Sequence, residues 1–431
     1  MLAIVGLASV LIVLVLIMSK KMTTMNALIV VPVIACLLVG QGASMGGYIT
    51  SGIKSVAATA AMFIFAVVFF GIMSDVGAFE RIVNRIIKII GTDPVKICIG
   101  TLVITIMTHL DGSSATTFLI TVPALLPIYD KLKMDRRVLA TIVAMGAGTM
   151  NLVPWGGPTV RAATALEVSL TELYNPMIVP QVCGLIVCLG ISIFFGVKEK
   201  KRLGDTLANI DLTPAALSEE EAALRRPKLF VFNLILIVVT IAALVAELLP
   251  PAGCFMVALA IALMVNYPNV DLQRKLVDKH AEAALMMASV LFAAGIFTGI
   301  MKESGMLAAM AEALVAILPA AIAKHVALLV GVFSMPLSLL FDPDSFYYAV
   351  LPVISSAAEA FGVEAIAVGR AAICGQITVG FPISPLTPST FLLIGLSGLD
   401  LGDHQKHSFV PLWIVSLAIV AVAVVLGNIP V

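Results

Sequence analysis

Apolar runs long enough to cross a lipid bilayer recur from one end of this chain to the other. A membrane-spanning helix needs about 20 predominantly apolar residues. By this measure we expect ten complete crossings, at 2–18, 24–41, 56–74, 138–170, 176–197, 229–249, 253–268, 284–301, 366–396 and 409–430. Because 60% of the residues are hydrophobic and only 12% are charged, no room remains for a sizeable soluble domain. The sequence therefore predicts an all-α polytopic membrane protein.

Two further apolar stretches, 95–129 and 324–361, are each split by a short polar turn. The distribution of Lys and Arg indicates how they lie, because cytoplasmic loops carry an excess of these residues. If the N-terminus is outside, most of the 26 Lys and Arg residues fall in inner loops, and the outer loops hold Lys54, Lys302 and Lys324. The flanks of the first stretch are basic and those of the second are not. We therefore predict two re-entrant hairpins that enter from opposite sides, and two extracytoplasmic termini.

The two halves of the chain repeat one pattern at a nearly constant spacing. Residues 71–73, Gly-Ile-Met, recur at 299–301, and Asp111 recurs as Asp342. Such a repeat indicates two copies of one structural unit.

Each copy holds five crossings and one hairpin, and the odd number of crossings turns the second copy upside down. We predict a first repeat over 1–197, a cytoplasmic linker over 198–228 and a second, inverted repeat over 229–431. Inverted repeats with broken helices are typical of secondary transporters.

Two crossings contain residues that cannot continue a helix. Proline and glycine interrupt the first at Asn151–Arg161 and the second at Gly380–Thr390. Lipid offers no water to the released backbone groups, so each break must be buried in protein or line a wet cavity. Arg161 would normally be kept at this depth to meet an anion or a carboxylate. The alternative is a proline kink whose arginine reaches the interface.

The hairpin turns are polar as well. In the first, Gly112 permits the reversal, and the hydroxyls and N–H groups that follow suit a carboxylate. Asp111 is either a helix cap or a coupling residue, and His109 is either a proton carrier or a structural residue. In the second turn, Asp342 has the form of a helix cap, whereas Asp344 lies inside the first helical turn and could bind a coupling cation or proton.

We expect the polar residues of these four turns to form one binding site. The candidates for substrate binding are Ser113, Ser114, Thr116, Asn151, Gly156, Gly157, Thr159, Arg161, Ser345, Ser384, Thr387, Ser389 and Thr390. The candidates for proton or cation coupling are Asp111, Asp344 and His109.

Several other functions find no support in the sequence. It has no basic tract suited to nucleic acid, and its six cysteines are scattered without the spacing of a metal site. It also lacks the His-Glu-x-x-His and Gly-x-Ser-x-Gly groupings of common hydrolases. We therefore predict no enzyme, no catalytic residues and no dedicated metal site. An ion channel is the alternative from another functional class, because channels also use re-entrant loops.

Four motifs resemble those of one transporter family: residues 111–117, 151–161, 384–390 and 399–405. They are similar to the citrate-metal:proton symporters, the CitMHS family, whose superfamily also contains the divalent anion:sodium symporters. The resemblance implies uptake of citrate with a divalent cation such as Mg²⁺ or Ca²⁺, driven by protons, across the cytoplasmic membrane of a bacterium. It also implies a homodimer in which a transport domain slides like an elevator against a scaffold domain.

In this interpretation the protein needs no cofactor, because the metal ion arrives bound to the citrate. Trivalent citrate with a divalent cation carries one negative charge, which Arg161, helix N-termini and hydroxyls could balance. Two departures from the family pattern keep a second transporter open, the sodium-coupled uptake of another di- or tricarboxylate. Residues 342–345 read Asp-Pro-Asp-Ser instead of a sequence like Ser-Asn-Asp-Ala, and residues 375–383 lack an expected histidine.

Overall fold

The computed structural model describes residues 1–431 apart from 20, 79–84, 87–88, 205–218 and 318–323. Every regular element among the described residues is a helix, which confirms the all-α class. The middle of the predicted linker, 205–218, lies outside the described residues, and the short helix α11 (Glu219–Leu224) follows it.

The helices follow the order that the sequence predicts. Before the linker they are α1 (Leu2–Met18), α2 (Thr24–Leu38), α3 (Met45–Asp75), α5 (Pro94–Thr108), α6 (Ser114–Lys131), α7 (Arg136–Met150), α8 (Gly157–Leu166), α9 (Leu170–Tyr174) and α10 (Ile178–Leu203). After α11 they are α12 (Phe230–Val245), α13 (Pro251–Asn266), α14 (Val270–Glu303), α15 (Met306–Ile317), α17 (Val326–Leu337), α18 (Leu351–Glu359), α19 (Ala365–Ile373), α20 (Pro388–Ser397) and α21 (Leu401–Val425).

Within the described part of the chain, six helical stretches are long and apolar enough to cross a membrane. They include α3, α14 and α21, and shorter apolar helices include α1, α2 and α13. The structure extends α3 and α14 well beyond the expected crossings 56–74 and 284–301, to 31 and 34 residues. Their added turns are too polar to belong to a hydrophobic run, so hydropathy alone did not predict them.

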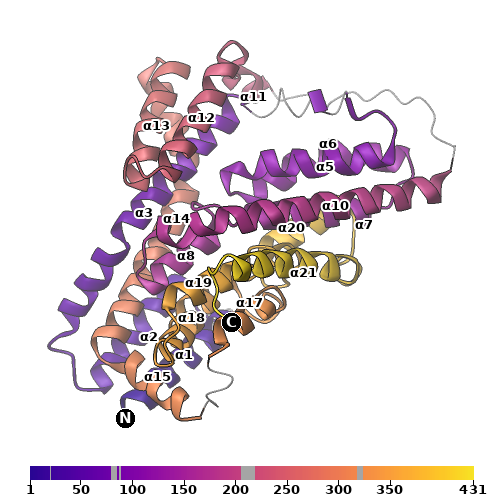
Figure 1. Cartoon of the computed structure of the whole chain (residues 1–431). Coiled ribbons are helices and arrows are strands. Elements are labelled where there is room, and N and C mark those ends of the chain that lie inside the picture. The colour runs from indigo at the N-terminus through magenta and orange to yellow at the C-terminus, as the bar shows by residue number, and fades with distance from the viewer. Residues whose placement is uncertain (20, 79–84, 87–88, 205–218, 318–323) are drawn as a thin grey trace.

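Helices α3 and α14 pack against each other in antiparallel directions, and Figure 1 shows the two helices running side by side. Near the start of α3, a Cβ on Gly52 would lie 1.9 Å from the carbonyl oxygen of Gly295. At the other end of α3, the Asp75 carboxylate accepts hydrogen bonds from Lys279 (2.7 Å) and His280 (2.8 Å). Small residues let helix backbones approach this closely in a membrane.

The remaining helices form two groups. In the first group, α2 packs on α14, α13 packs on α3, and α1, α12 and α15 complete the group. Figure 1 shows α12 and α13 at one end of the α3–α14 pair and α1, α2 and α15 at the other. The second group contains α5, α6, α7, α10, α17, α19, α20 and α21. Helices α8 and α18 lie between the two groups and contact both.

The close approach of α3 and α14 gives a stability prediction. We expect Gly52→Ala to lower the thermal midpoint in detergent, because the new methyl group would collide with the backbone at Gly295. Overpacking of this kind typically costs about 1–3 kcal/mol. Gly47→Ala is the matched control, since it lies on the same helix and no atom lies within 4 Å of the added Cβ. Equal midpoints for the two variants would contradict the packing described.

Candidate functional site

The first broken crossing is unwound between α7 and α8, over Asn151–Gly156. The two glycines of this break lie too close to neighbouring atoms for a residue with a Cβ atom. A Cβ on Gly156 would lie 2.1 Å from the Asn151 carbonyl oxygen, and one on Gly157 would lie 2.7 Å from Nη1 of Arg161. Helix α8 therefore starts inside the protein, where its first N–H groups have no preceding turn to bond.

Side chains satisfy the carbonyl groups that this break releases. Thr159 Oγ1 donates to the carbonyl oxygen of Leu152 at 2.9 Å. Asn151 Nδ2 donates to the carbonyl oxygen of Ile377 in the second broken crossing, also at 2.9 Å. The two breaks are thus in direct contact, although they are more than 200 residues apart in the sequence.

The first hairpin turn joins α5 to α6. Gly112 has a φ of +69°, which reverses the chain, and Ser113 caps α6 by accepting a hydrogen bond from the Thr116 amide (3.3 Å). Asp111 Oδ1 accepts from the Ser113 amide at 2.8 Å, so this carboxylate stabilises the turn. His109 is fully buried, and its Nδ1 lies 2.8 Å from the hydroxyl of Thr117. The coupling roles of Asp111 and His109 stay predictions.

The second hairpin turn joins α17 to α18. Asp342 Oδ1 accepts from the amides of Asp344 and Ser345 at 3.1 Å each, and its Oδ2 accepts from the Ser345 hydroxyl. Asp342 therefore caps the turn, as its position before a proline predicts. The chain continues as a π-helical turn over Ser345–Val350 before α18 begins, a local irregularity that is frequent at functional sites.

The second broken crossing runs from the end of α19 to the start of α20. Ser384 donates its hydroxyl to the Ser338 carbonyl oxygen, and Thr387 and Thr390 both donate to that of Phe381, at 2.7 and 2.8 Å. Because a hydroxyl has a single proton, these three candidates are hydrogen-bond acceptors toward any ligand in this state.

Contacts between different turns bring all four together. The hydrogen bond between Asn151 and Ile377 is one of these contacts. Three more hydrogen bonds join different turns: Trp155 Nε1 to Leu110 O (2.8 Å), Ser114 Oγ with Ser389 Oγ (2.6 Å), and Tyr347 Oη to Gln376 O (2.7 Å). Helices α6, α8 and α20 all begin at this convergence, and the π-helical turn leading into α18 begins there as well.

A buried ion pair completes the arrangement. Arg161 Nε on α8 lies 2.7 Å from Asp344 Oδ1 in the second hairpin turn, and the two side chains are 10% and 15% exposed. Sequence reasoning singled out both residues but assigned them separate roles, one toward the substrate and one toward the coupling ion. The structure shows that each neutralises the other's charge.

The convergence has the chemistry of an anion site. Helix N-termini present N–H donors and a partial positive charge, and Arg161 supplies a guanidinium whose charge Asp344 balances in this state. Ser114 and Ser389 place hydroxyls in the first turns of α6 and α20. The described residues hold no group of three or more His, Cys, Asp or Glu side chains placed to bind a metal ion.

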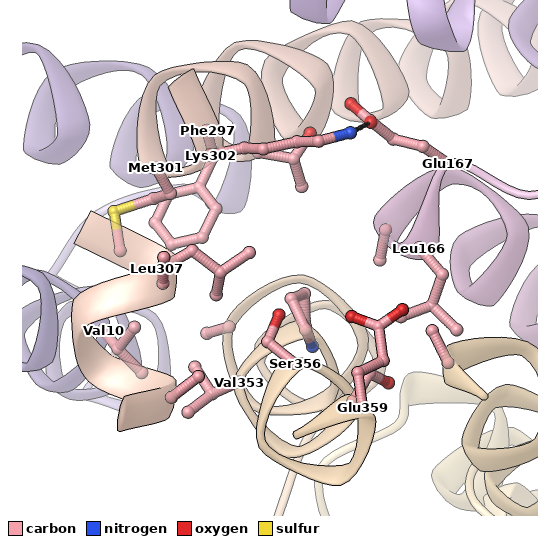
Figure 2. A pocket seen from close by; sticks show the side chains of 18 of the residues that line it. Val10, Leu166, Glu167, Phe297, Met301, Lys302, Leu307, Val353, Ser356 and Glu359 are labelled. Atoms are coloured by element: carbon pink, nitrogen blue, oxygen red, sulfur yellow. Dashed lines mark hydrogen bonds and ion pairs between the residues drawn. The ribbon is translucent and has the colours of Figure 1, made fainter. Parts of the chain in front are cut away.

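A cavity of about 490 Å³ lies between the first group of helices and the segments that contain α8 and α18. On one side it is lined by α8 from Ala165 and by the end of the π-helical turn and α18 from Ala349, each little more than one turn along the chain from Arg161 or Asp344, which do not line it themselves. On the other side lie α1, α14 and α15. Figure 2 shows an ion pair between Lys302 and Glu167 at one edge of the cavity.

Sequence reasoning missed several residues that hold the second break in place. Ser338 Oγ accepts from the Ile377 amide at 2.9 Å, and nothing in the sequence marks this serine. His404 Nε2 and Gln405 Nε2 each lie 2.9 Å from a backbone oxygen of the break, on Pro382 and Ile383 respectively. These two residues belong to the 399–405 motif, so that motif was an available signal.

Comparison with known proteins gives consistent results. Residues 9–375 match the model of the citrate transporter family CitMHS. The citrate transporter of Bacillus subtilis (strain 168) is 43% identical over 420 residues, which are 97% of each chain. The Mg²⁺/citrate complex secondary transporter of the same strain is 40% identical over 431 residues, covering 99% of this chain and 98% of that protein.

A solved structure is similar in fold. The crystal structure of the YdaH transporter from Alcanivorax borkumensis matches with a TM-score of 0.59, covering 90% of this chain and 89% of that one. At 13% identity, this similarity concerns the fold alone.

The contact between the first hairpin turn and α20 can be tested by cross-linking. We expect the Ser114→Cys/Ser389→Cys double variant to form a disulfide under mild oxidation, because the two hydroxyl oxygens are 2.6 Å apart. Peptide mass spectrometry would identify the bridge. The pair Ser114→Cys/Ser397→Cys is the control, since Ser397 lies two turns further along α20 and bonds within that helix. A bridge in the control but not in the first pair would contradict the geometry.

Proposed function

The chain belongs to the citrate transporter family, and we propose that it imports citrate as a complex with a divalent metal ion by proton symport. The family and its relatives are transporters, and the protein is not an enzyme. The relative named for the Mg²⁺/citrate complex supports the metal-bound form of the substrate. The metal ion is then part of the cargo and needs no resident site.

The observation that carries this proposal is the convergence of four polar turns, to which Arg161 contributes a guanidinium paired with Asp344. Three helix N-termini, the start of a π-helical turn and one guanidinium suit a ligand of low negative charge, such as citrate with one divalent cation. We assign the direct ligand contacts to the first turns of α6 and α20, at Ser114 and Ser389, and to Arg161. The other predicted residues of the four turns shape the pocket and hold its backbone.

We further propose that the two halves are inverted repeats and that the protein works as an elevator. The contacts of α3 and α14 support the inversion, because helices that correspond in the two halves lie antiparallel. Gly71 packs against His280, and the equivalent Gly299 packs against Gly52. In this proposal the first group of helices is the scaffold of a homodimer in a bacterial cytoplasmic membrane, with both termini outside. The second group, together with α8 and α18, carries the substrate.

Uptake measurements test the substrate and the coupling ion. We expect purified protein in proteoliposomes to accumulate labelled citrate under an inward proton gradient when Mg²⁺ or Ca²⁺ is present, and to lose this uptake on metal chelation. Equal uptake after chelation would reject the metal complex. Loss of uptake when choline replaces Na⁺, with the proton gradient intact, would instead favour the sodium-coupled alternative.

Substitution of Arg161 tests the site. We expect Arg161→Ala to weaken uptake by at least about 30-fold, because removing one partner of a buried charge interaction costs about 2–5 kcal/mol. The single variant leaves Asp344 buried without its partner, so the charge-balanced Arg161→Ala/Asp344→Asn variant should be folded and equally inactive.

Arg370→Ala provides the matched control for Arg161. Arg370 lies on α19, and its guanidinium donates to the Glu172 carbonyl oxygen at 2.8 Å, away from the four turns. We expect this variant to keep its uptake. A loss in Arg370→Ala with normal uptake in the balanced Arg161 variant would overturn the assignment.

A further inference from the structure

We propose that Asp344 competes with the substrate for Arg161, and that this competition couples substrate binding to the uptake of one proton. The inference rests on the proposed function and names the residue that carries the proton. It starts from the ion pair of Arg161 Nε with Asp344 Oδ1, which is 2.7 Å long and largely shielded from solvent.

The ion pair with Asp344 leaves N–H groups of the Arg161 guanidinium available for another ligand. Only Nε of Arg161 bonds Asp344, whereas Nη1 lies next to Gly157 at the start of α8. A guanidinium has five N–H donors in a rigid fork and can hold a carboxylate through two of them. A carboxylate of the substrate at the convergence would therefore bind the same cation that Asp344 now neutralises.

The surroundings of Asp344 leave Arg161 as its principal charge partner. The charged and titratable groups that face it are Arg161 from α8, Asp342 in the same turn, and Tyr348 in the π-helical turn. Asp342 is already used as the cap of the turn, where it accepts three hydrogen bonds. Among the described residues, Arg161 is the hydrogen-bond partner of the Asp344 carboxylate.

Charge balance then requires a proton. The Arg161–Asp344 pair is neutral, so a complex with one negative charge would leave a net negative charge buried at the site, which is costly. When Asp344 takes a proton on a carboxylate oxygen from outside water, it releases Arg161, and the guanidinium balances the ligand. After the complex leaves on the inner side, Asp344 returns the proton to water and pairs with Arg161 again. One proton moves with each complex, and no other reactant is needed.

The test compares wild type with Asp344→Asn by exchange of labelled Mg²⁺-citrate across proteoliposome membranes. We expect the apparent KM of wild type to fall as the pH is lowered, by up to about tenfold per pH unit, because binding is linked to one proton. In Asp344→Asn the neutral amide mimics the protonated acid, so exchange should persist with a KM that does not vary with pH. Proton-driven accumulation should be lost in this variant.

Matched variants isolate the contribution of the Asp344 carboxylate. Citrate itself titrates, but wild type and variant are measured in the same solutions, so the difference between their slopes reports the protein. Asp342→Asn changes the neighbouring carboxylate. Its apparent KM should vary with pH as that of wild type does, whatever the substitution does to the thermal midpoint. Asp344→Glu restores a titratable carboxylate, so its apparent KM should again depend on pH.

Each result has a distinct meaning. A wild-type slope in Asp344→Asn would place the proton on another group, and loss of exchange in a folded Asp344→Asn would make the carboxylate a ligand of the substrate. Either result overturns the inference while leaving metal-citrate transport in place. If wild type shows no metal-dependent citrate exchange at any pH, the proposed function itself fails, and the inference fails with it.

Discussion

Backbone groups without water are the constraint on which this fold depends. An unpaired carbonyl or amide in an apolar interior costs up to several kcal/mol, and each broken crossing releases several of them. The structure supplies the missing donors from distant parts of the chain. Asn151 donates a hydrogen bond to the carbonyl oxygen of Ile377, Tyr347 to that of Gln376, and Trp155 to that of Leu110. The breaks are stable because the four turns meet. In each of these contacts, a side chain of one turn donates a hydrogen bond to a backbone carbonyl oxygen of another.

The same constraint determines what the site can bind. Several carbonyl oxygens at the breaks accept hydrogen bonds from side chains, and the protons of Thr387 and Thr390 are used for this purpose. The helix starts contribute N–H donors, of which Ser113 and Asp342 already cap those of Thr116, Asp344 and Ser345. A cluster of donors suits an anion, and Arg161 adds a guanidinium that is paired with Asp344 in this state. The way the broken helices are stabilised therefore supplies the donors that the proposed anion site would use.

The sequence predicted the parts of this arrangement that depend on local chemistry. Prolines and glycines located both breaks, Gly112 located the first hairpin turn, and the position of Asp342 before proline identified a helix cap. It did not predict the Arg161–Asp344 pair, because no local pattern links residues 183 positions apart. Nor did it predict the donor for each carbonyl, or the turns that lengthen α3 and α14, because both follow from tertiary contacts.

The helices of the first group are packed against each other more tightly than against the helices across the cavity. Within the first group, Gly52 and Gly295 bring α3 and α14 into backbone contact, and Asp75 fixes the far end of the pair. Between the first group and the helices α8 and α18 lies a cavity of about 490 Å³, with an ion pair of Lys302 and Glu167 at its edge. A charged pair at the water-exposed edge of a cavity contributes little, about 0–1 kcal/mol, whereas close-packed helices resist sliding because their side chains interlock. The first group is therefore held together by direct backbone contact, whereas the cavity separates part of its surface from α8 and α18.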